Sequence, residues 1–237
     1  MTKAMGTEGR LRLYQLLSPA LPVGAFSYAE GLEVLVQRGA LPDGAAVAAW
    51  LEAELQGGAL RLEAAALPGL MALLERWQSQ AQGGSSPASA ACLRRLQERE
   101  SWLLAQREAR ELRAQQRQMG GSLLQLLADL GWPLPEPVAL AWPAAFAWAG
   151  CCLAIPAPQL IEAYLYGWTA NQLSAAVRLV PLGPTEAQRL QLALAPAISL
   201  QAELLLDVEP EQLWNAGVGA GMAQLQHAEL YSRLFRS

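Results

Sequence analysis

Hydrophobic residues recur at helical spacing along most of the chain. The clearest case is the segment after Pro158, where apolar side chains follow the i, i+3, i+4, i+7 rule: Ile161, Tyr164, Leu165, Trp168, Leu173, Ala176 and Val177. Asp43 can cap a further helix that runs to about Gln56 with apolar residues on one face. No segment alternates apolar and polar residues as a half-buried strand does. The pattern therefore predicts an all-α fold.

Proline, glycine and capping residues divide this pattern into roughly ten short or medium helices. Ser27 with Glu30 three residues later fits a capping box, which predicts a helix from there to near Gly39. Further helices are expected over residues 60–78, 90–118, 121–130 and 185–206, and from 211 to near the end of the chain. In the charged helix, Arg107 and Glu111 have the i, i+4 separation of an exposed ion pair. The expected organisation is a compact helical bundle.

We expect a single all-α domain over residues 1–237, because the chain is long enough to bury a large core and shows no repeat of 20 to 50 residues. Residues 1–10 are expected to be flexible. The Gly- and Ser-rich stretch 79–89 predicts a mobile loop, and residues 226–237 form a C-terminal tail.

The uncharged run over residues 137–161 is long enough to cross a membrane as one helix. Pro143, Pro156 and Pro158 interrupt it, and no Lys or Arg cluster flanks it. A helix that is apolar on all sides can also be buried by its neighbours. We therefore expect a central buried helix and no membrane association.

Composition narrows the functional class. The chain is 53% hydrophobic and 16% charged, which argues against disorder, and its net charge of −4 argues against binding nucleic acid through phosphates. The three cysteines, Cys92, Cys151 and Cys152, form neither a disulfide framework nor a Cys-x-x-Cys zinc motif. We expect a cytoplasmic protein.

The residues needed for the common catalytic sites are scarce. A P-loop requires a lysine after its glycines, but the only lysine is Lys3, and the Gly-rich stretch 217–221 has none. His227 is the only histidine, so we expect no metal site. A hydrolase or redox enzyme that pairs Cys151 or Cys152 with His227 remains the alternative hypothesis. We expect no catalytic residue and no cofactor.

Two surfaces are candidates for protein binding. Arg110, Arg113 and Arg117 line one side of their helix, which is either a solvated face or a docking surface for an acidic partner. On a terminal helix, Tyr231, Leu234 and Phe235 would share one face. Leaving such side chains in water forgoes roughly 1.5 to 3 kcal/mol each, so they should pack either on the chain's own core or on another protein.

Several separated motifs, in this order, resemble the UreF family of urease accessory proteins. They are SPALPVGAFSY at residues 18–28 with Gly-Leu-Glu at 31–33, then Asn171-Gln172 with Ala-Ala-Val at 175–177 and Pro-Leu-Gly at 181–183, and YSRLFRS at 231–237. Weaker matches are RQMG at 117–120 and WPAAF at 142–146. The resemblance spans nearly the whole chain.

This resemblance implies an all-α homodimer that binds UreD, also called UreH, and then recruits the GTPase UreG, which carries nickel to the urease apoprotein. The C-terminal motif implies that UreD binding and the surface that receives UreG depend on Tyr231, Ser232, Arg233, Leu234, Phe235 and Arg236. The N-terminal motif implies either partner contact or local architecture for Phe26, Ser27, Tyr28, Glu30, Gly31 and Glu33.

The chain departs from the family pattern at three places. Pro184 follows Pro-Leu-Gly where the family often has Gln, and Ala228 then Glu229 follow the tail histidine where many members have Glu directly. Ala29 and Glu30 precede Gly-Leu-Glu, where the family often has Ser-His or Ser-Gln.

Overall fold

The computed structural model describes residues 6–81 and 86–237. These residues contain two 3₁₀ helices, η1 (Ala25–Ser27) and η2 (Pro210–Gln212), and no β-strand. The α-helices within them are α1 (Thr7–Leu16), α2 (Leu32–Gln37), α3 (Gly44–Gly57), α4 (Leu60–Ala81), α5 (Pro87–Ala105), α6 (Arg110–Asp129), α7 (Trp142–Cys152), α8 (Ala157–Leu179), α9 (Pro184–Leu205) and α10 (Val218–His227). The predicted all-α fold is confirmed.

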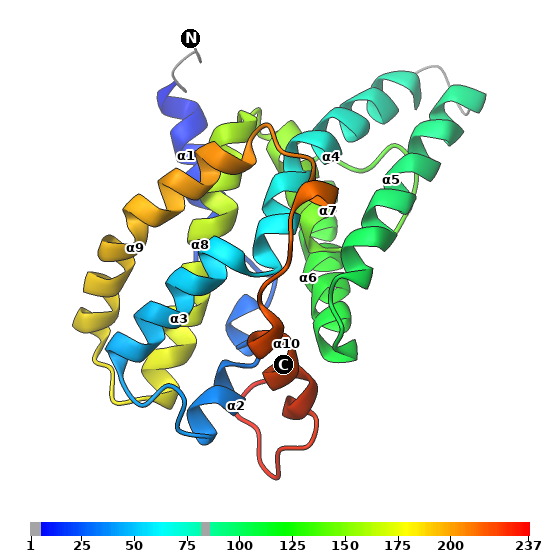
Figure 1. Ribbon diagram of the computed structural model, residues 1–237. Helices are drawn as coiled ribbons and strands as arrows, with labels where there is room; N and C mark the ends of the chain where they lie inside the picture. The colour runs from blue at the N-terminus through cyan, green and yellow to red at the C-terminus, as the bar shows by residue number, and fades with distance from the viewer. Residues whose placement is uncertain (1–5, 82–85) are drawn as a thin grey trace.

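Helix α4 is the central element, since it packs against α3, α5, α7 and α8. Helix α8 packs in turn on α9, and α6 packs on α7. In Figure 1, α3, α8 and α9 form one side of the molecule, and α4 and α5 extend from the other side as a hairpin. The C-terminus lies beside α2 and α10, so the motif near the start of the sequence and the motif at its end lie close together in space (Figure 1).

Aromatic side chains fill the core between these helices. Trp77 and Trp148 are fully buried, and the Phe146 and Tyr164 rings meet edge to face with centroids 5.2 Å apart. The Trp148 indole N–H donates to the carbonyl of Trp132 at 3.1 Å, so its polar group is satisfied. The Phe146–Tyr164 contact joins α7 to α8, and the Trp148 bond joins α7 to the segment that follows α6.

Two elements follow the sequence prediction closely. The Asp43 carboxylate accepts a hydrogen bond from the backbone N–H of Ala46 at 2.9 Å and caps α3, as predicted. Most of the apolar residues predicted to share one face of α8 are buried: Ile161, Tyr164, Leu165, Leu173 and Ala176. Periodicity identified these residues, although other positions of α8 are buried as well, among them Leu160, Ala163 and Thr169.

The capping box predicted at Ser27 and Glu30 is wrong. Ser27 lies in η1, and α2 begins later, after Gly31 with a φ of +82°. The Glu30 carboxylate accepts hydrogen bonds from the Gln115 amide at 2.9 Å and the Trp168 indole at 3.1 Å. Partners from distant helices have replaced the local capping bonds.

The helix predicted over residues 90–118 is interrupted at 106–109, between α5 and α6. Arg107 is buried there and donates to Glu63 at 2.7 Å, so the predicted exposed pair with Glu111 is wrong. Arg113 donates to the carbonyls of Arg107 and Glu108 at 2.6 and 2.8 Å. The break places a buried charge inside the fold.

The short helix predicted after Gly121 is also wrong, because α6 continues through Gly120 and Gly121. A Cβ atom at Gly120 would lie 2.3 Å from the carbonyl oxygen of Leu140. The glycine therefore serves close packing of α6 on the segment that enters α7.

The apolar run over 137–161 forms α7 and the start of α8, separated by a turn in which Ala154 has a φ of +53°. Its centre, residues 144–149, is buried by other helices, as expected. Among the described residues, no single helix has the length and apolarity to cross a membrane, although α3 and α4, bent by 44°, meet those criteria as a pair.

The terminal helix is shorter than predicted. Helix α10 ends at His227, and residues 228–237 are not helical, so Tyr231, Leu234 and Phe235 do not share a helical face. The predictions of flexibility for 1–10 and 79–89 fall partly on residues 1–5 and 82–85, which lie outside the described ranges. Those predictions and the single-domain assignment stay predictions.

Candidate partner-binding site

The C-terminal segment, residues 228–237, lies against the N-terminal segment, residues 25–33. The backbone N–H of Arg236 donates to the carbonyl of Ser27 at 2.9 Å. The N–H groups of Ala29 and Glu30 donate to the carbonyl of Ser237 at 2.8 and 3.2 Å. The two motifs at opposite ends of the sequence therefore form one structural unit.

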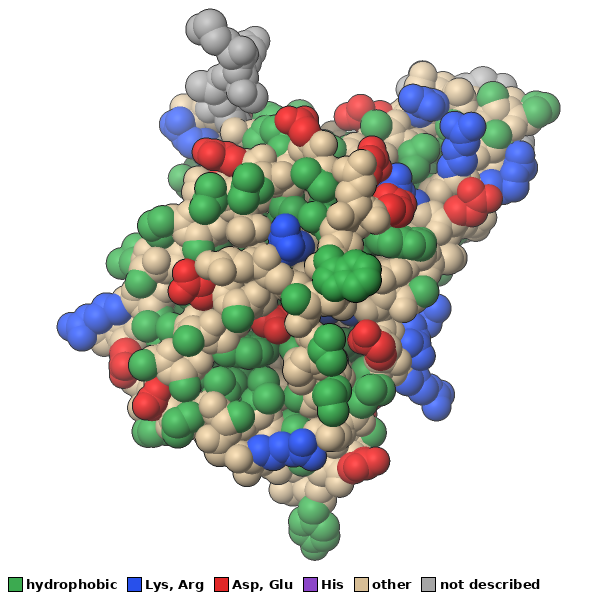
Figure 2. Space-filling view, viewed as in Figure 1, with side chains coloured by type: hydrophobic (Ala, Val, Ile, Leu, Met, Phe, Trp, Pro, Cys, Tyr) green, Lys and Arg blue, Asp and Glu red, His purple; other side chains and the backbone are tan. Residues whose placement is uncertain are grey.

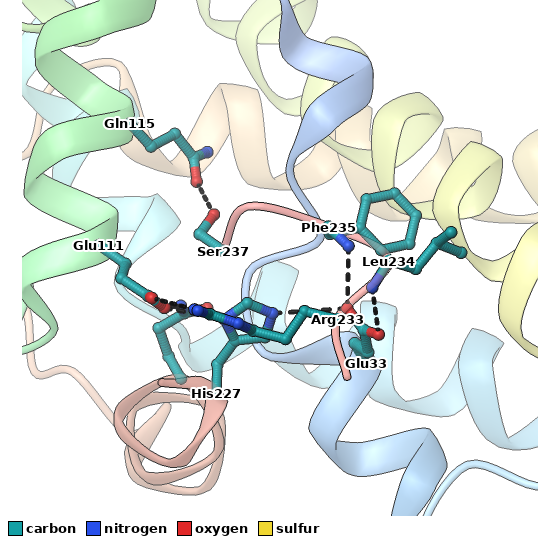
Figure 3. Close-up of polar contacts among 9 residues, drawn as sticks. Glu33, Glu111, Gln115, His227, Arg233, Leu234, Phe235 and Ser237 are labelled. Atoms are coloured by element: carbon teal, nitrogen blue, oxygen red, sulfur yellow. Dashed lines mark hydrogen bonds and ion pairs between the residues drawn. The ribbon is translucent and has the colours of Figure 1, made fainter. Parts of the chain in front are cut away.

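Glu33 anchors the C-terminal segment (Figure 3). It lies in the first turn of α2 and is 2% exposed. Its carboxylate accepts hydrogen bonds from the backbone N–H groups of Leu234 at 2.7 Å and Phe235 at 3.1 Å. These bonds satisfy two main-chain donors of a segment that is not helical.

His227 joins Glu33 to a second carboxylate. Its ring nitrogens lie 2.8 Å from the Glu111 carboxylate and 3.4 Å from that of Glu33. Arg233 donates to the other oxygen of Glu111 at 2.8 Å. Figure 3 shows these side chains converging from α2, α6, α10 and the C-terminal segment. The imidazole and guanidinium groups thus hold the segment to α6.

Gly31 allows α10 to approach α2. A Cβ atom at this glycine would lie 3.1 Å from the backbone nitrogen of Gln224 and 3.3 Å from the Cβ of Ala223. Its φ of +82° is also one that other residues rarely adopt. Glycine at this position in the motif is thus required both by backbone conformation and by packing.

Phe235 and Ser237 are the buried residues of the C-terminal segment. The guanidinium of Arg178 lies 4.5 Å from the Phe235 ring centroid, a cation–π contact. The Ser237 hydroxyl donates to the Gln115 amide oxygen (Figure 3). The segment therefore packs partly on the chain's own core, which was one of the two arrangements considered from the sequence.

The remaining predicted residues of the segment face solvent. Tyr231 is fully exposed and Leu234 about half exposed, and Ser232, Arg233 and Arg236 are exposed as well. Phe26 in the N-terminal segment is 70% exposed. An ordered backbone thus presents two aromatic rings, a leucine and two arginines on the surface.

The other residues of the N-terminal motif make contacts within the fold. Tyr28 is buried, and its hydroxyl donates to the Gln118 amide oxygen at 2.8 Å. Its carbonyl accepts from the Asn171 amide at 3.1 Å, which places a second matched motif in the same unit. Ser27 contributes its carbonyl rather than its hydroxyl.

Helix α10 carries an apolar stripe that sequence reasoning missed. Val218, Met222 and Leu225 are exposed at i, i+4 and i+7, and exposed Trp214 precedes them. Figure 2 shows hydrophobic side chains gathered over the lower part of the face where Figure 1 places α2, α3 and α10. The signal was available in the spacing of apolar residues within the helix predicted from residue 211.

The arginine stripe on α6 lies apart from the face that holds the C-terminal segment. Arg110 and Arg117 are exposed, whereas Arg113 is half-buried against backbone carbonyls. Glu111, Gln115 and Gln118, at i, i+4 and i+7, make the contacts to the two segments. This polar face was also missed from the sequence, although its spacing was visible.

The alternative enzyme hypothesis pairs Cys151 or Cys152 with His227, but His227 forms its hydrogen bonds with other residues. The hydrogen-bond partners of His227 are Glu33 and Glu111, and neither cysteine is among them. Burial raises the pKa of Cys151 and of Cys152 to about 12, which keeps both thiols protonated at neutral pH. Among the described residues, no group of three or more His, Cys, Asp or Glu side chains is placed to hold a metal ion.

Comparisons with known proteins agree on one family. The family model named UreF matches residues 41–195. A protein of Alkalilimnicola ehrlichii is 40% identical over 231 residues, which cover 95% of each chain. Relatives from Synechocystis and Prochlorococcus marinus strain MIT 9215 are 37% and 35% identical and cover at least 97% of both chains. All three are named urease accessory protein UreF, and their matches extend beyond the region of the family model.

Proposed function

The chain belongs to the UreF family of urease accessory proteins, and on this premise we propose that it is a non-catalytic scaffold for nickel insertion into the urease active site. In this role it binds UreD, also called UreH, and recruits and regulates the GTPase UreG. The urease apoprotein receives the nickel within that assembly.

The observation that carries this proposal is the exposed apolar surface of a well-anchored segment. Glu33, His227 and Phe235 hold the C-terminal segment to the body, while Tyr231 and Leu234 remain in water. The stripe of Val218, Met222 and Leu225 lies on the helix that leads into the segment. Apolar surface that is ordered and exposed favours a protein interface.

We assign roles by exposure. Tyr231, Leu234 and the α10 stripe bind UreD through apolar contacts. Arg236, with Ser232 beside it, and Arg110 and Arg117 on α6 offer polar and guanidinium groups to acidic partner surfaces, including that of UreG. Arg233 contributes to partner binding by holding the segment to α6 through Glu111. Phe26 is a partner contact, whereas Ser27, Tyr28, Glu30, Gly31 and Glu33 maintain the local architecture, and Arg113 ends the turn before α6.

A matched pair of tyrosine variants tests the UreD contact. Tyr231→Ala removes a fully exposed ring from the proposed interface, and Tyr14→Ala removes a 61% exposed ring from α1. Burying such a ring contributes roughly 1.5 to 3 kcal/mol. The Tyr231 variant should therefore bind UreD about tenfold or more weakly in a titration, whereas the Tyr14 variant should bind as the wild type does. Equal affinities for the two variants would remove Tyr231 from the interface.

The scaffold role itself is tested by deletion of residues 231–237. The full chain should co-purify with UreD and UreG and support nickel-dependent urease activation. The deletion should stay folded by circular dichroism and lose both capture and activation. Capture of UreD by the deleted chain would contradict the proposal, and so would failure of the full chain to capture either partner.

The proposal also includes homodimerisation in the cytoplasm without nucleic acid or membrane. The exposed apolar side chains on α9, Leu192, Leu200 and Leu204, are a second surface available for self-association. Sedimentation of the isolated chain at micromolar concentration should give the mass of a dimer. A monomer at all concentrations would remove this part of the proposal.

A further inference from the structure

A cavity of about 230 Å³ lies behind the N-terminal motif. The loop over residues 16–26 forms one wall, and α4, α6, α7 and α8 supply the others. Its polar lining consists mainly of Glu30, Glu63, Gln115, Gln116 and Asn171. Phe26, on the loop wall, is shared between this cavity and the assigned partner surface.

The cavity has an excess of negative charge. Glu30 and Glu63 line it, and among the residues that the structure describes no Arg or His does. Arg107 pairs with Glu63 at 2.7 Å and lies 3.9 Å from Glu30, but it lines two neighbouring pockets rather than this one. One guanidinium therefore balances two carboxylates, and a cation in the cavity would be stabilised by the remaining charge.

Gln116 provides an unused hydrogen-bond acceptor. The residue is 4% exposed, and its amide nitrogen donates to Glu63 at 3.2 Å. Its amide oxygen is buried and has no hydrogen-bond partner among the described residues. An unsatisfied buried acceptor costs about 1 to 3 kcal/mol. A ligand that donates hydrogen bonds would remove this cost.

The rest of the lining is aromatic and aliphatic. Trp142, Phe146, Tyr164 and Trp168 contribute rings, and the Trp142 and Phe146 centroids are 5.3 Å apart. Aromatic faces stabilise ammonium groups as well as alkyl chains. The described part of the lining has two carboxylates and no His or Cys, so these residues suit an organic cation better than a transition metal.

We infer that this cavity binds a small aliphatic amine in its protonated form. The ammonium group donates to Glu63, Glu30 and the free oxygen of Gln116, and the alkyl chain contacts the aromatic wall. The volume accommodates only a few carbon atoms, since sites for drug-sized ligands are about 300 to 1,000 Å³. This binding goes beyond the proposed scaffold function and does not require UreD or UreG.

The test compares n-pentylammonium chloride with 1-pentanol, a neutral molecule of similar shape. Isothermal titration and thermal unfolding of the full chain should give saturable binding and a higher Tm with the amine and little effect with the alcohol. Equal effects of the two would mean a merely apolar cavity and overturn the inference. So would absence of amine binding, or stabilisation by Mg²⁺ or Ni²⁺ and not by the amine.

Matched glutamine variants locate the site. Gln116→Leu should weaken amine binding about tenfold, the loss of one charge-assisted hydrogen bond. Gln191→Leu is the control, because Gln191 is also buried with unpartnered amide atoms but does not line the cavity. Equal losses in both variants would overturn the assignment.

A third variant guards against misfolding of the Gln116 variant. Ala170→Leu adds volume at a half-buried lining position and leaves every charge in place. It should abolish amine binding while its circular dichroism spectrum and UreD capture remain those of the wild type. Unchanged amine affinity in this variant would place the amine elsewhere and overturn the inference.

Discussion

Glu33 accepts hydrogen bonds from two consecutive backbone N–H groups and contacts the ring of the only histidine. A buried carboxylate in such a position replaces the hydrogen bonds that a helix would have provided. One side chain of α2 therefore binds main-chain groups of the C-terminal segment about two hundred residues away in sequence. The order of this segment is a tertiary property rather than a local one.

Replacing Glu33 by Ala should release the C-terminal segment. The N–H groups of Leu234 and Phe235 lose their acceptor, so their hydrogen exchange should accelerate about tenfold or more. Exchange measured by NMR, or by mass spectrometry of the C-terminal peptide, checks this. Glu52→Ala, at an exposed position on α3, is the control and should leave the exchange unchanged. Retained protection in the Glu33 variant would show that other contacts suffice.

Glu54 links stability to pH. Burial raises its pKa from 4.5 to about 6, against the opposing attraction of Arg107. The folded state therefore binds the Glu54 proton more tightly than the unfolded state does. Protonation of Glu54 stabilises the fold fully below about pH 4.5, and this stabilisation is lost as the pH rises through about 6.

Glu54→Gln stays neutral at every pH and should therefore be more stable than the wild type at pH 7, by on the order of 1 kcal/mol. The difference should shrink toward pH 4.5. Urea unfolding at pH 4.5, 6 and 7.5 measures it, with Glu52→Gln on the same helix as the control. A difference that does not change with pH would remove Glu54 as its source.

At the level of helices, the adjacent glycines of α6 have different functions. Gly120 faces the backbone of Leu140 at a distance that excludes a Cβ atom, whereas a Cβ at Gly121 would meet nothing within 4 Å. Comparing the same substitution at these two glycines therefore separates the effect of packing on stability from the effect of helix propensity.

Gly120→Ala should destabilise the protein by about 2 kcal/mol or more, since backbone atoms must move to admit the methyl group. Gly121→Ala should instead stabilise it by about 0.5 to 1 kcal/mol, because alanine favours a helix interior. Denaturant unfolding of both variants gives the two values directly. Similar effects of the same sign would contradict the packing role of Gly120.

These elements also mark where sequence reasoning succeeds. The cap of α3 at Asp43 and the core face of α8 were predictable, because each depends on residues within one or two turns. The start of α2 was not, because Glu30 bonds to Gln115 and Trp168 instead of capping. The end of α10 at His227 was also missed, and the segment that follows it is bound by tertiary contacts to Glu33.

The candidate site was predictable only in part. The two motifs carried Glu33, Gly31 and Phe235, but no local pattern indicates that they contact one another. Glu111 and Gln115 belong to no predicted site, although their i, i+4 spacing places them on one face of α6. Sequence spacing identifies a helix face, whereas its partner depends on the packing of the whole fold.

Across the whole molecule, one buried charge cluster connects distant segments. Arg107, between α5 and α6, bonds to Glu63 on α4, and Glu63 accepts from the Tyr164 hydroxyl on α8 at 2.7 Å. Burial alone would lower the pKa of Arg107, but attraction from Glu63 and Glu30 outweighs it and raises that pKa. The guanidinium therefore stays charged, and the cluster joins the hairpin side of the molecule to the side formed by α8.

Replacing Arg107 by Met tests how far global stability depends on this cluster. The variant leaves Glu63 buried without its cation, and removal of one partner from a buried ion pair costs about 3 to 5 kcal/mol. Arg117→Met is the matched control, because Arg117 is exposed on α6 and the same change there should cost no more than about 0.5 kcal/mol. Urea unfolding followed by circular dichroism should give one cooperative transition, with a much lower midpoint for the Arg107 variant. If both variants unfold at the wild-type midpoint, Glu63 is stabilised well enough by Tyr164 and Gln116, and the two sides of the fold are held together by apolar packing instead.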